Sequence, residues 1–171
     1  AAKEAFLYKP QDSYRVGGSQ NKADKQAGTN LPGGVITHFY LPEYDEKKDT
    51  VSLYYLSKNG DTIQTYSTFA SEDRNKLKIK KGGNTFVWNM MYPPAKRFDG
   101  MILWWGTLSG PVASTGDYQV VLQCQGKSLR QPFRILKNPA SEGNEADIQK
   151  QFDFVASVHK KLDEAHQAII D

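Results

Sequence analysis

The chain has 171 residues, 39% of them hydrophobic, which is enough to build one hydrophobic core with an appendage. Its 22 basic and 19 acidic residues leave a net charge of +3, and the densest basic run, Lys76 to Lys81, has no interleaved aromatic residues, so we expect no nucleic-acid binding. The single cysteine, Cys124, excludes an internal disulfide, and no apolar run reaches the about 20 residues that a membrane-spanning helix requires.

Residues 1–33 are expected to form an extended, glycine-rich leader or linker. A short apolar stretch, Phe6 to Tyr8, comes first. Residues 17–30 are then too polar and too rich in glycine to pack, so we predict a mobile loop there. The first residues show no signal-peptide pattern, and in a secreted parent protein the signal would lie upstream of this chain.

Residues 34–138 show the period of two that is typical of half-buried strands. One predicted inward face consists of alternate residues from Val35 to Leu41, and the next of alternate residues from Val51 to Tyr55. Asn59-Gly60 then lies between two apolar stretches. It predicts a hairpin with a two-residue turn, because both residues accept a positive φ.

Two aromatic segments carry the expected core of this region. Phe86 and Trp88 alternate along one strand, and a strand that begins after Gly116 brings Tyr118 to the same core. Between them, Met101–Trp105 is predicted as a further strand or strand-like crossing. The total is about seven strands without strand–helix–strand alternation, which predicts an antiparallel β-sandwich with Trp88 and Tyr118 buried together.

Residues 139–171 change to a helical period. Asn144 is a helix-capping residue with Asp147 three positions later, and they predict a helix from about Glu145 to Ile170, about 39 Å long. Its apolar residues recur at threes and fours: Ile148, Phe152, Val155, Leu162 and Ile169, with Val158 and Ala165 beside them. Such a stripe is expected to be covered by the sandwich, by a second copy in an antiparallel homodimer, or by a further helix.

No catalytic or metal site is predicted, and no cofactor. His159 and His166, with Asp163 between them, can face one side of the helix, but a spacing of seven residues is about 10.5 Å along the axis, too far for one ion. The acidic turn from Glu43 to Asp49 lacks the spacing of a calcium loop. We find no serine-nucleophile elbow, phosphate-binding glycine loop or assignable pair of catalytic carboxylates.

The best candidates for ligand binding are aromatic. Trp104 and Trp105, together with Tyr92, offer flat apolar faces of the kind that stack on sugar rings. Adjacent strand residues point to opposite faces, so at most one of the two tryptophans is expected in the core. The other must be covered by a loop, a helix, a partner or a ligand. A structural role or a contact with a neighbouring domain is the preferred interpretation of these residues.

A known domain pattern is visible in the strands that carry the aromatic core. The Gly-Asn-x-Phe-x-Trp motif at 83–88 and the Gly-x-Tyr-x-Val motif at 116–120 resemble the Ig-like domain of the flagellar hook-capping protein and its bacterial relatives. The flanks at 6–15 and 31–36 look like the region that follows the β-propeller in large secreted proteins with BNR (Asp-box) repeats, of sortilin or glycosyl-hydrolase type. This resemblance implies an Ig-like sandwich of about seven strands and a C-terminal helix that continues into a helical hairpin, so that the helix is truncated here.

The function expected from the resemblance is that of a non-catalytic spacer or docking module in a larger, secreted BNR-repeat protein. Its partners would be the upstream propeller and a downstream helix of the same parent chain, in an extracytoplasmic location. A carbohydrate-binding module that uses its exposed aromatic residues on a polysaccharide is the alternative. An accessory part of a glycoside hydrolase is a third interpretation, which depends on family likeness alone.

Overall fold

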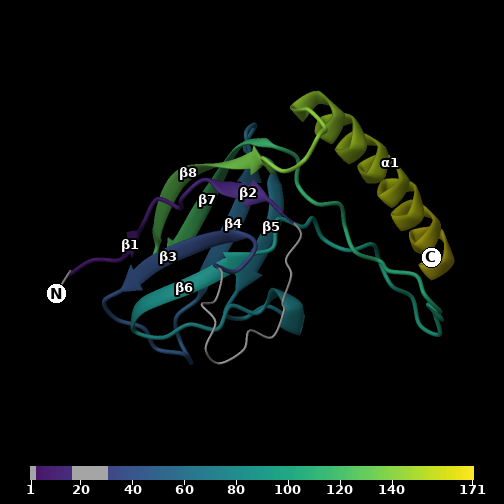
Figure 1. Ribbon diagram of the computed structural model, residues 1–171. Coiled ribbons are helices and arrows are strands. Elements are labelled where there is room, and N and C mark those ends of the chain that lie inside the picture. The colour runs from purple at the N-terminus through teal and green to yellow at the C-terminus, as the bar shows by residue number, and fades with distance from the viewer. Residues whose placement is uncertain (1–2, 17–30) are drawn as a thin grey trace, which may run out of the picture.

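The computed structural model describes residues 3–16 and 31–171, and the loop expected over residues 17–30 lies outside the described residues. In the described part, eight strands are followed by one long helix (Figure 1). A single 3₁₀ turn, η1 (Asp73–Asn75), lies between β5 and β6. The elements are β1 (Phe6–Leu7), β2 (Ser13–Arg15), β3 (Val35–Leu41), β4 (Val51–Ser57), β5 (Thr62–Ser67), β6 (Gly82–Trp88), β7 (Gly116–Cys124), β8 (Lys127–Lys137) and α1 (Glu145–Ile170).

The strands form two sheets that share one core. One sheet has three strands in the order β1-β3-β6, and the other has five in the order β2-β8-β7-β4-β5. Neighbouring strands are antiparallel except β2, which runs parallel to β8. A mainly β fold with a long C-terminal helix is therefore confirmed. A seven-stranded sandwich is not, because the described residues form eight strands in sheets of three and five.

Part of the expected leader belongs to these sheets. β1 pairs with β3, and β2 pairs with β8, so each of these short segments is the edge strand of a sheet. Residues 6–15 therefore extend over both sheets and are not separate from the β structure.

The core lies between the sheets and is dominated by aromatic rings. Trp88 on β6 is fully buried and stacks on Tyr55 of β4, with ring centroids 4.6 Å apart, so each sheet contributes one ring. Tyr118 and Phe133 lie at centroid distances of 6.3 and 6.4 Å from Trp88. The prediction that Trp88 and Tyr118 share one core from different strands is confirmed. The alternating inward faces predicted for β3 and β4 are buried as well.

The two tyrosines of this cluster keep their hydroxyl groups hydrogen-bonded. Tyr118 donates to the carbonyl oxygen of Ser114 over 2.8 Å, and the Tyr55 and Thr37 hydroxyl oxygens lie 2.8 Å apart. Burial raises the pKa of Tyr118 to about 12 and also raises the pKa of Tyr55. Both hydroxyls are therefore neutral at physiological pH, and neither ring buries an unpaired polar group.

The hairpin between β4 and β5 forms as predicted, but with a different turn. The connection covers residues 58–61, Gly60 donates to the carbonyl oxygen of Ser57 over 3.0 Å, and Gly60 has a φ of 92°. Asn59 does not adopt a positive φ, so the two-residue turn predicted at Asn59-Gly60 is wrong. A two-residue turn occurs instead between β7 and β8, where Gln125 and Gly126 have φ values of 49° and 73°.

Helix α1 has the bounds that its sequence predicts. The Asn144 side chain accepts from Asp147 N–H over 2.9 Å, and the Asp147 carboxylate accepts from Asn144 N–H over 3.2 Å. This reciprocal capping box satisfies two backbone donors and fixes where the helix begins. Within the described ranges, no helix is long and apolar enough to cross a membrane.

We expect Trp88→Ala to lower the free energy of unfolding by about 3–5 kcal/mol, because it opens a cavity against Tyr55 in the shared core. Trp105 is 98% exposed and supplies the control. Trp105→Ala should change that free energy by no more than about 0.5 kcal/mol. Urea unfolding followed by circular dichroism measures both, and a Trp88→Ala variant with the urea midpoint of the parent would contradict this description of the core.

Candidate interaction site

Between β6 and β7 the chain leaves the sheets as a two-limbed excursion, residues 92–110, which we call the arm (Figure 1). Its limbs are joined near the sheets by hydrogen bonds from Tyr92 N–H to Pro111 O (2.9 Å) and from Ala95 N–H to Leu108 O (2.8 Å). Gly110 permits this close approach, because a Cβ atom there would lie 2.3 Å from the carbonyl oxygen of Pro93.

Met101–Trp105 forms the tip of the arm. Of the two predicted forms, a strand or a strand-like crossing, the strand does not occur, because the segment pairs with no strand among the described residues and the tip projects beyond the edges of both sheets. Gly100, just before the tip, has a φ of 77°, which turns the chain there. An apolar run that resembles a strand in the sequence is therefore the exposed end of a loop.

Helix α1 lies along the arm and packs on it with one face (Figure 1). Near the sheets, the rings of Phe152 and Tyr92 pack with centroids 5.2 Å apart. Farther out, His166 meets Phe98 edge to face at 5.4 Å. The contact face consists of the buried and half-buried residues that recur at threes and fours along the helix: Ile148, Phe152, Ala156, His159, Asp163 and His166. It is apolar near the sheets and polar in its outer half.

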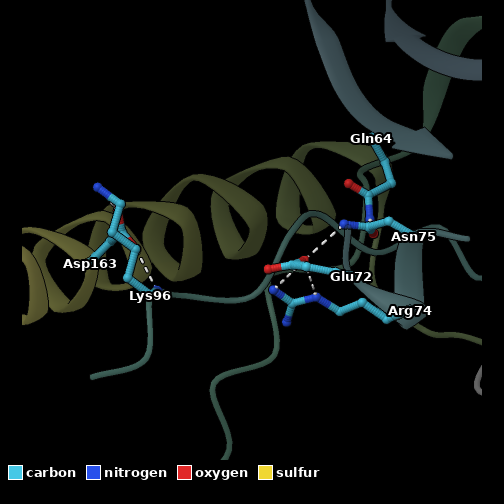
Figure 2. A network of polar contacts seen from close by, with 6 residues as sticks. All are labelled: Gln64, Glu72, Arg74, Asn75, Lys96 and Asp163. Carbon is cyan, nitrogen blue, oxygen red and sulfur yellow. Dashed lines mark hydrogen bonds and ion pairs between the residues drawn. The ribbon is translucent and has the colours of Figure 1, made fainter. Parts of the chain in front are cut away.

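Two polar side chains of α1 hold the backbone of Lys96, an arrangement that we call the Lys96 grip. Asp163 Oδ1 accepts from Lys96 N–H over 2.7 Å, and Figure 2 shows the two residues facing each other. His166 Nδ1 lies 2.6 Å from the Lys96 carbonyl oxygen, and because that oxygen only accepts, the imidazole donates. The Lys96 ammonium lies 3.6 Å from Asp163 Oδ2. The hydrogen bond from Lys96 N–H, together with this charge, lowers the pKa of Asp163.

His159, Asp163 and His166 do face one side of the helix, and this side is the one that contacts the arm. Asp163 and His166 form hydrogen bonds with the backbone of Lys96, whereas His159 packs and its buried Nε2 atom has no hydrogen-bond partner among the described residues. Among residues 3–16 and 31–171, no three His, Cys, Asp or Glu side chains come together in a way that would hold a metal ion.

Five other apolar residues of α1 lie outside this contact face. Val155, Val158, Leu162 and Ile169 are 41, 52, 36 and 61% exposed, and Ala165 between them is exposed as well. We call these five residues the seam. At about 100° per residue, the seam lies about a quarter turn around the helix from the contact face. The predicted stripe is therefore divided: Ile148 and Phe152 pack, whereas Val155, Leu162 and Ile169 are exposed.

The tip of the arm is also apolar and exposed. Ile102, Trp104 and Trp105 are 77, 86 and 98% exposed. Neither tryptophan enters the core, and no loop or helix of the described residues covers either of them, so of the covers expected from their adjacency a partner or a ligand remains. Tyr92 lies at the opposite end of the arm, against Phe152. The structure therefore does not bring the three residues predicted for sugar stacking together on one platform.

A groove of about 760 Å³ lies between the arm and η1. Its polar wall is pre-organised, as Figure 2 shows: Glu72 accepts from Arg74 and Asn75, over 2.8 and 3.0 Å, and Gln64 donates to Asn75 over 3.1 Å. Tyr92, Leu103 and Ile170 also line it, which brings the arm tip and the end of α1 to the same groove, whereas neither Trp104 nor Trp105 does.

In the acidic turn between β3 and β4, the carboxylates accept hydrogen bonds from backbone N–H groups of the same turn. Asp49 accepts from Asp45 N–H over 2.8 Å, and Asp45 accepts from Lys47 N–H over 3.0 Å. These carboxylates stabilise the turn by capping its own backbone donors.

Sequence reasoning missed the Lys96 grip and the polar wall of the groove. The sequence does contain a signal for part of the grip. Asp163 and His166 are polar residues three positions apart on the same side of the helix as Phe152, and this pattern indicates a helix face that contacts a polar group. Lys96 itself could not be found in this way, because its contribution is a backbone N–H and carbonyl group.

Comparison of the chain with protein-family models, with curated proteins and with solved structures finds no significant match.

We expect Gly110→Ala to destabilise the base of the arm by about 1–3 kcal/mol, because the added methyl group meets backbone oxygens of Tyr92 and Pro93 that cannot move aside cheaply. Gly106→Ala is the matched control, since a Cβ atom there meets only Leu103 Cδ2 at 3.6 Å. Urea unfolding gives the free energies, and hydrogen exchange of the Ala95 amide localises the effect. Equal behaviour of the two variants would show that the limbs do not approach as described.

The Lys96 amide should report the ionisation of Asp163. Because the pKa of Asp163 is lowered in the folded protein, the stabilisation from its charge is complete above the ordinary value of 3.8 and is lost as pH falls through the lower, folded value. We expect the Lys96 amide proton to shift upfield with a midpoint below 3.8. Asp163→Asn should abolish this titration, and Glu164→Gln should not. A midpoint at or above 3.8 would contradict the grip.

Proposed function

We propose that this chain is a non-catalytic docking or spacer module, and that α1 is its principal docking element. The observation that carries the proposal is the seam. The helix is already fixed to the arm by a separate face, so Val155, Val158, Leu162, Ala165 and Ile169 are exposed without being needed for the fold.

The energetics favour a cover for the seam. Each large apolar side chain gains roughly 1.5–3 kcal/mol when it is fully buried, and the four large seam residues are 36–61% exposed. Together with Ala165, they recur at intervals of three and four residues, which is the spacing that a second helix packs against. A helix is therefore the partner element that we propose.

The proposed setting is a larger, secreted, extracytoplasmic BNR-repeat protein, in which a downstream helix covers the seam and a propeller lies upstream. Support for this setting is the resemblance of the motifs at 83–88 and 116–120. Pairing of two copies through the seam is the alternative way to cover it. Carbohydrate binding takes second place to docking, because Tyr92 and the Trp104–Trp105 pair lie at opposite ends of the arm.

Thiol labelling tests the docking role. Cys124 is buried, and burial raises the pKa of its thiol, so Cys124 itself reacts slowly and the labelling reports on the engineered cysteines. Val158→Cys places a thiol on the seam, and the adjacent Ser157→Cys places one on the exposed side away from it. In the intact parent protein, we expect Val158→Cys to react at least about tenfold more slowly than in the isolated chain, because a docked face that opens at a cost of about 1.4 kcal/mol exposes its thiol about a tenth of the time.

Ser157→Cys should react at the same rate in both proteins. If Val158→Cys also reacts equally fast in both, the seam is not a docking face and the proposed function fails. A rate for Val158→Cys that falls as the isolated chain is concentrated would favour the homodimer over the parent helix.

A further inference from the structure

The arm and α1 concentrate the exposed apolar surface of this molecule. Of the sixteen large hydrophobic residues that are exposed in the described ranges, ten belong to these two elements. The most exposed of all are Trp104 and Trp105, at 86 and 98%. An apolar patch of this kind marks a site of contact with a protein, a ligand or a membrane.

The tip is held away from the sheets by the packing of the arm on α1. The Lys96 grip and the contact of Phe98 with His166 lie a few residues before the tip. From Phe152, which packs at the base of the arm, to Ile170, the helix extends for about 27 Å. Ile170 and Leu103 line the same groove, so the end of α1 and the tip form one distal end (Figure 1).

This distal end is convex. Trp104 and Trp105 are successive residues and both are almost fully exposed, so water reaches the tip from more than one side. Neither indole lines the groove, so a ligand bound in the groove would not contact them. A rigid protein surface or a sugar chain can contact only one face of such a tip. The lipids of a bilayer are fluid and can surround the whole tip. The shape therefore favours a lipid surface.

The side-chain types at the tip, and the unpaired charge of Arg97 beside it, agree with this choice. Tryptophan prefers the headgroup level of a bilayer, where its ring is apolar and its N–H group stays hydrated. Lys96 and Arg97 precede the tip and outnumber its one acidic neighbour, Asp99. The last turns of α1 add Lys160 and Lys161 against Asp163, Glu164 and Asp171, so basic and acidic residues balance over the whole distal end. Lys96 pairs with Asp163 and Lys161 pairs with Glu164, whereas Arg97 has no ion-pair partner among the described residues. An unpaired basic residue set back from an apolar tip, as Arg97 is, is attracted to anionic headgroups.

We propose that the tip of the arm binds a lipid bilayer at its surface, with Trp104 and Trp105 inserted at headgroup level and without crossing the membrane. Ile102 enters beside them, and Arg97 lies close enough to the tip to meet anionic headgroups. This binding is independent of the docking role of the seam and adds a second kind of partner to the module.

Flotation of the full chain with vesicles tests the proposal, with phosphatidylcholine alone and with a mixture of phosphatidylcholine and phosphatidylglycerol. We expect the chain to float with the mixed vesicles, and brominated phosphatidylcholine to quench its tryptophan emission. Trp88 is fully buried in the core, so the quenching reports on the two tip residues. Trp104→Ser with Trp105→Ser should lower the partition coefficient at least about tenfold and abolish the quenching.

Phe69→Ser is the matched control, because Phe69 is 56% exposed but lies outside the arm and α1, and it should float like the parent. Arg97→Gln should lower partitioning about fivefold on the anionic vesicles and leave that on neutral vesicles unchanged. Thermal midpoints equal to the parent's establish that the variants are folded, as expected for exposed positions.

Three results would overturn the proposal: no flotation with either lipid, flotation without quenching, or undiminished flotation of the double tryptophan variant. Retention of the chain in polysaccharide gels, lost in that variant and without flotation, would assign the tip to carbohydrate instead. Because α1 is unchanged in these variants, failure here leaves the labelling test of the seam intact.

Discussion

The Lys96 grip is the interaction on which the outer half of this molecule depends. Beyond Ala95 the two limbs of the arm are no longer joined by the hydrogen bonds that close its base, and the two sheets do not reach it. Asp163 and His166 bind the N–H and the carbonyl group of one residue, so they fix both position and orientation of the chain there. Each bond to a charged or polar group contributes only about 1–3 kcal/mol, but together they convert a long loop into a supported projection.

The grip also determines what α1 leaves exposed. A helix of this composition gains most by burying its aliphatic residues. Instead it packs with Ile148 and Phe152 near the sheets and with His159, Asp163 and His166 farther out. The seam is thereby rotated away from the arm and left free for a partner. The exposed apolar surface is thus a consequence of the polar contacts, and this is the reason that we propose it as an interaction surface.

The sequence predicted those features that are determined by nearby residues. The bounds of α1 followed from Asn144 and Asp147, which form the expected capping box. The inward faces of β3 and β4 followed from alternation, and the shared burial of Trp88 and Tyr118 from their positions on aromatic strands. Edge strands β1 and β2 were missed, because strands of two and three residues have too little pattern to recognise.

The features that the sequence did not predict correctly depend on contacts between residues that are distant in the chain. Met101–Trp105 has the composition of a strand, and only the absence of a neighbouring strand at that distance makes it a tip. The spacing of three and four along α1 fits two overlapping faces, and nothing local decides which one packs. The face that packs is determined by Lys96, about 70 residues earlier in the chain, because its backbone N–H and carbonyl groups form hydrogen bonds with Asp163 and His166.

The orientation of α1 on the arm determines which face of the helix is exposed, and solvent paramagnetic relaxation measures it directly. A soluble gadolinium chelate added to the isotopically labelled protein relaxes the protons that water reaches. We predict strong relaxation of the methyl groups of Val155, Val158 and Leu162, and weak relaxation of the Ile148 methyls and the His166 ring. Protected seam methyls together with a strongly relaxed His166 ring would contradict this orientation, because the helix would then be packed through its aliphatic face.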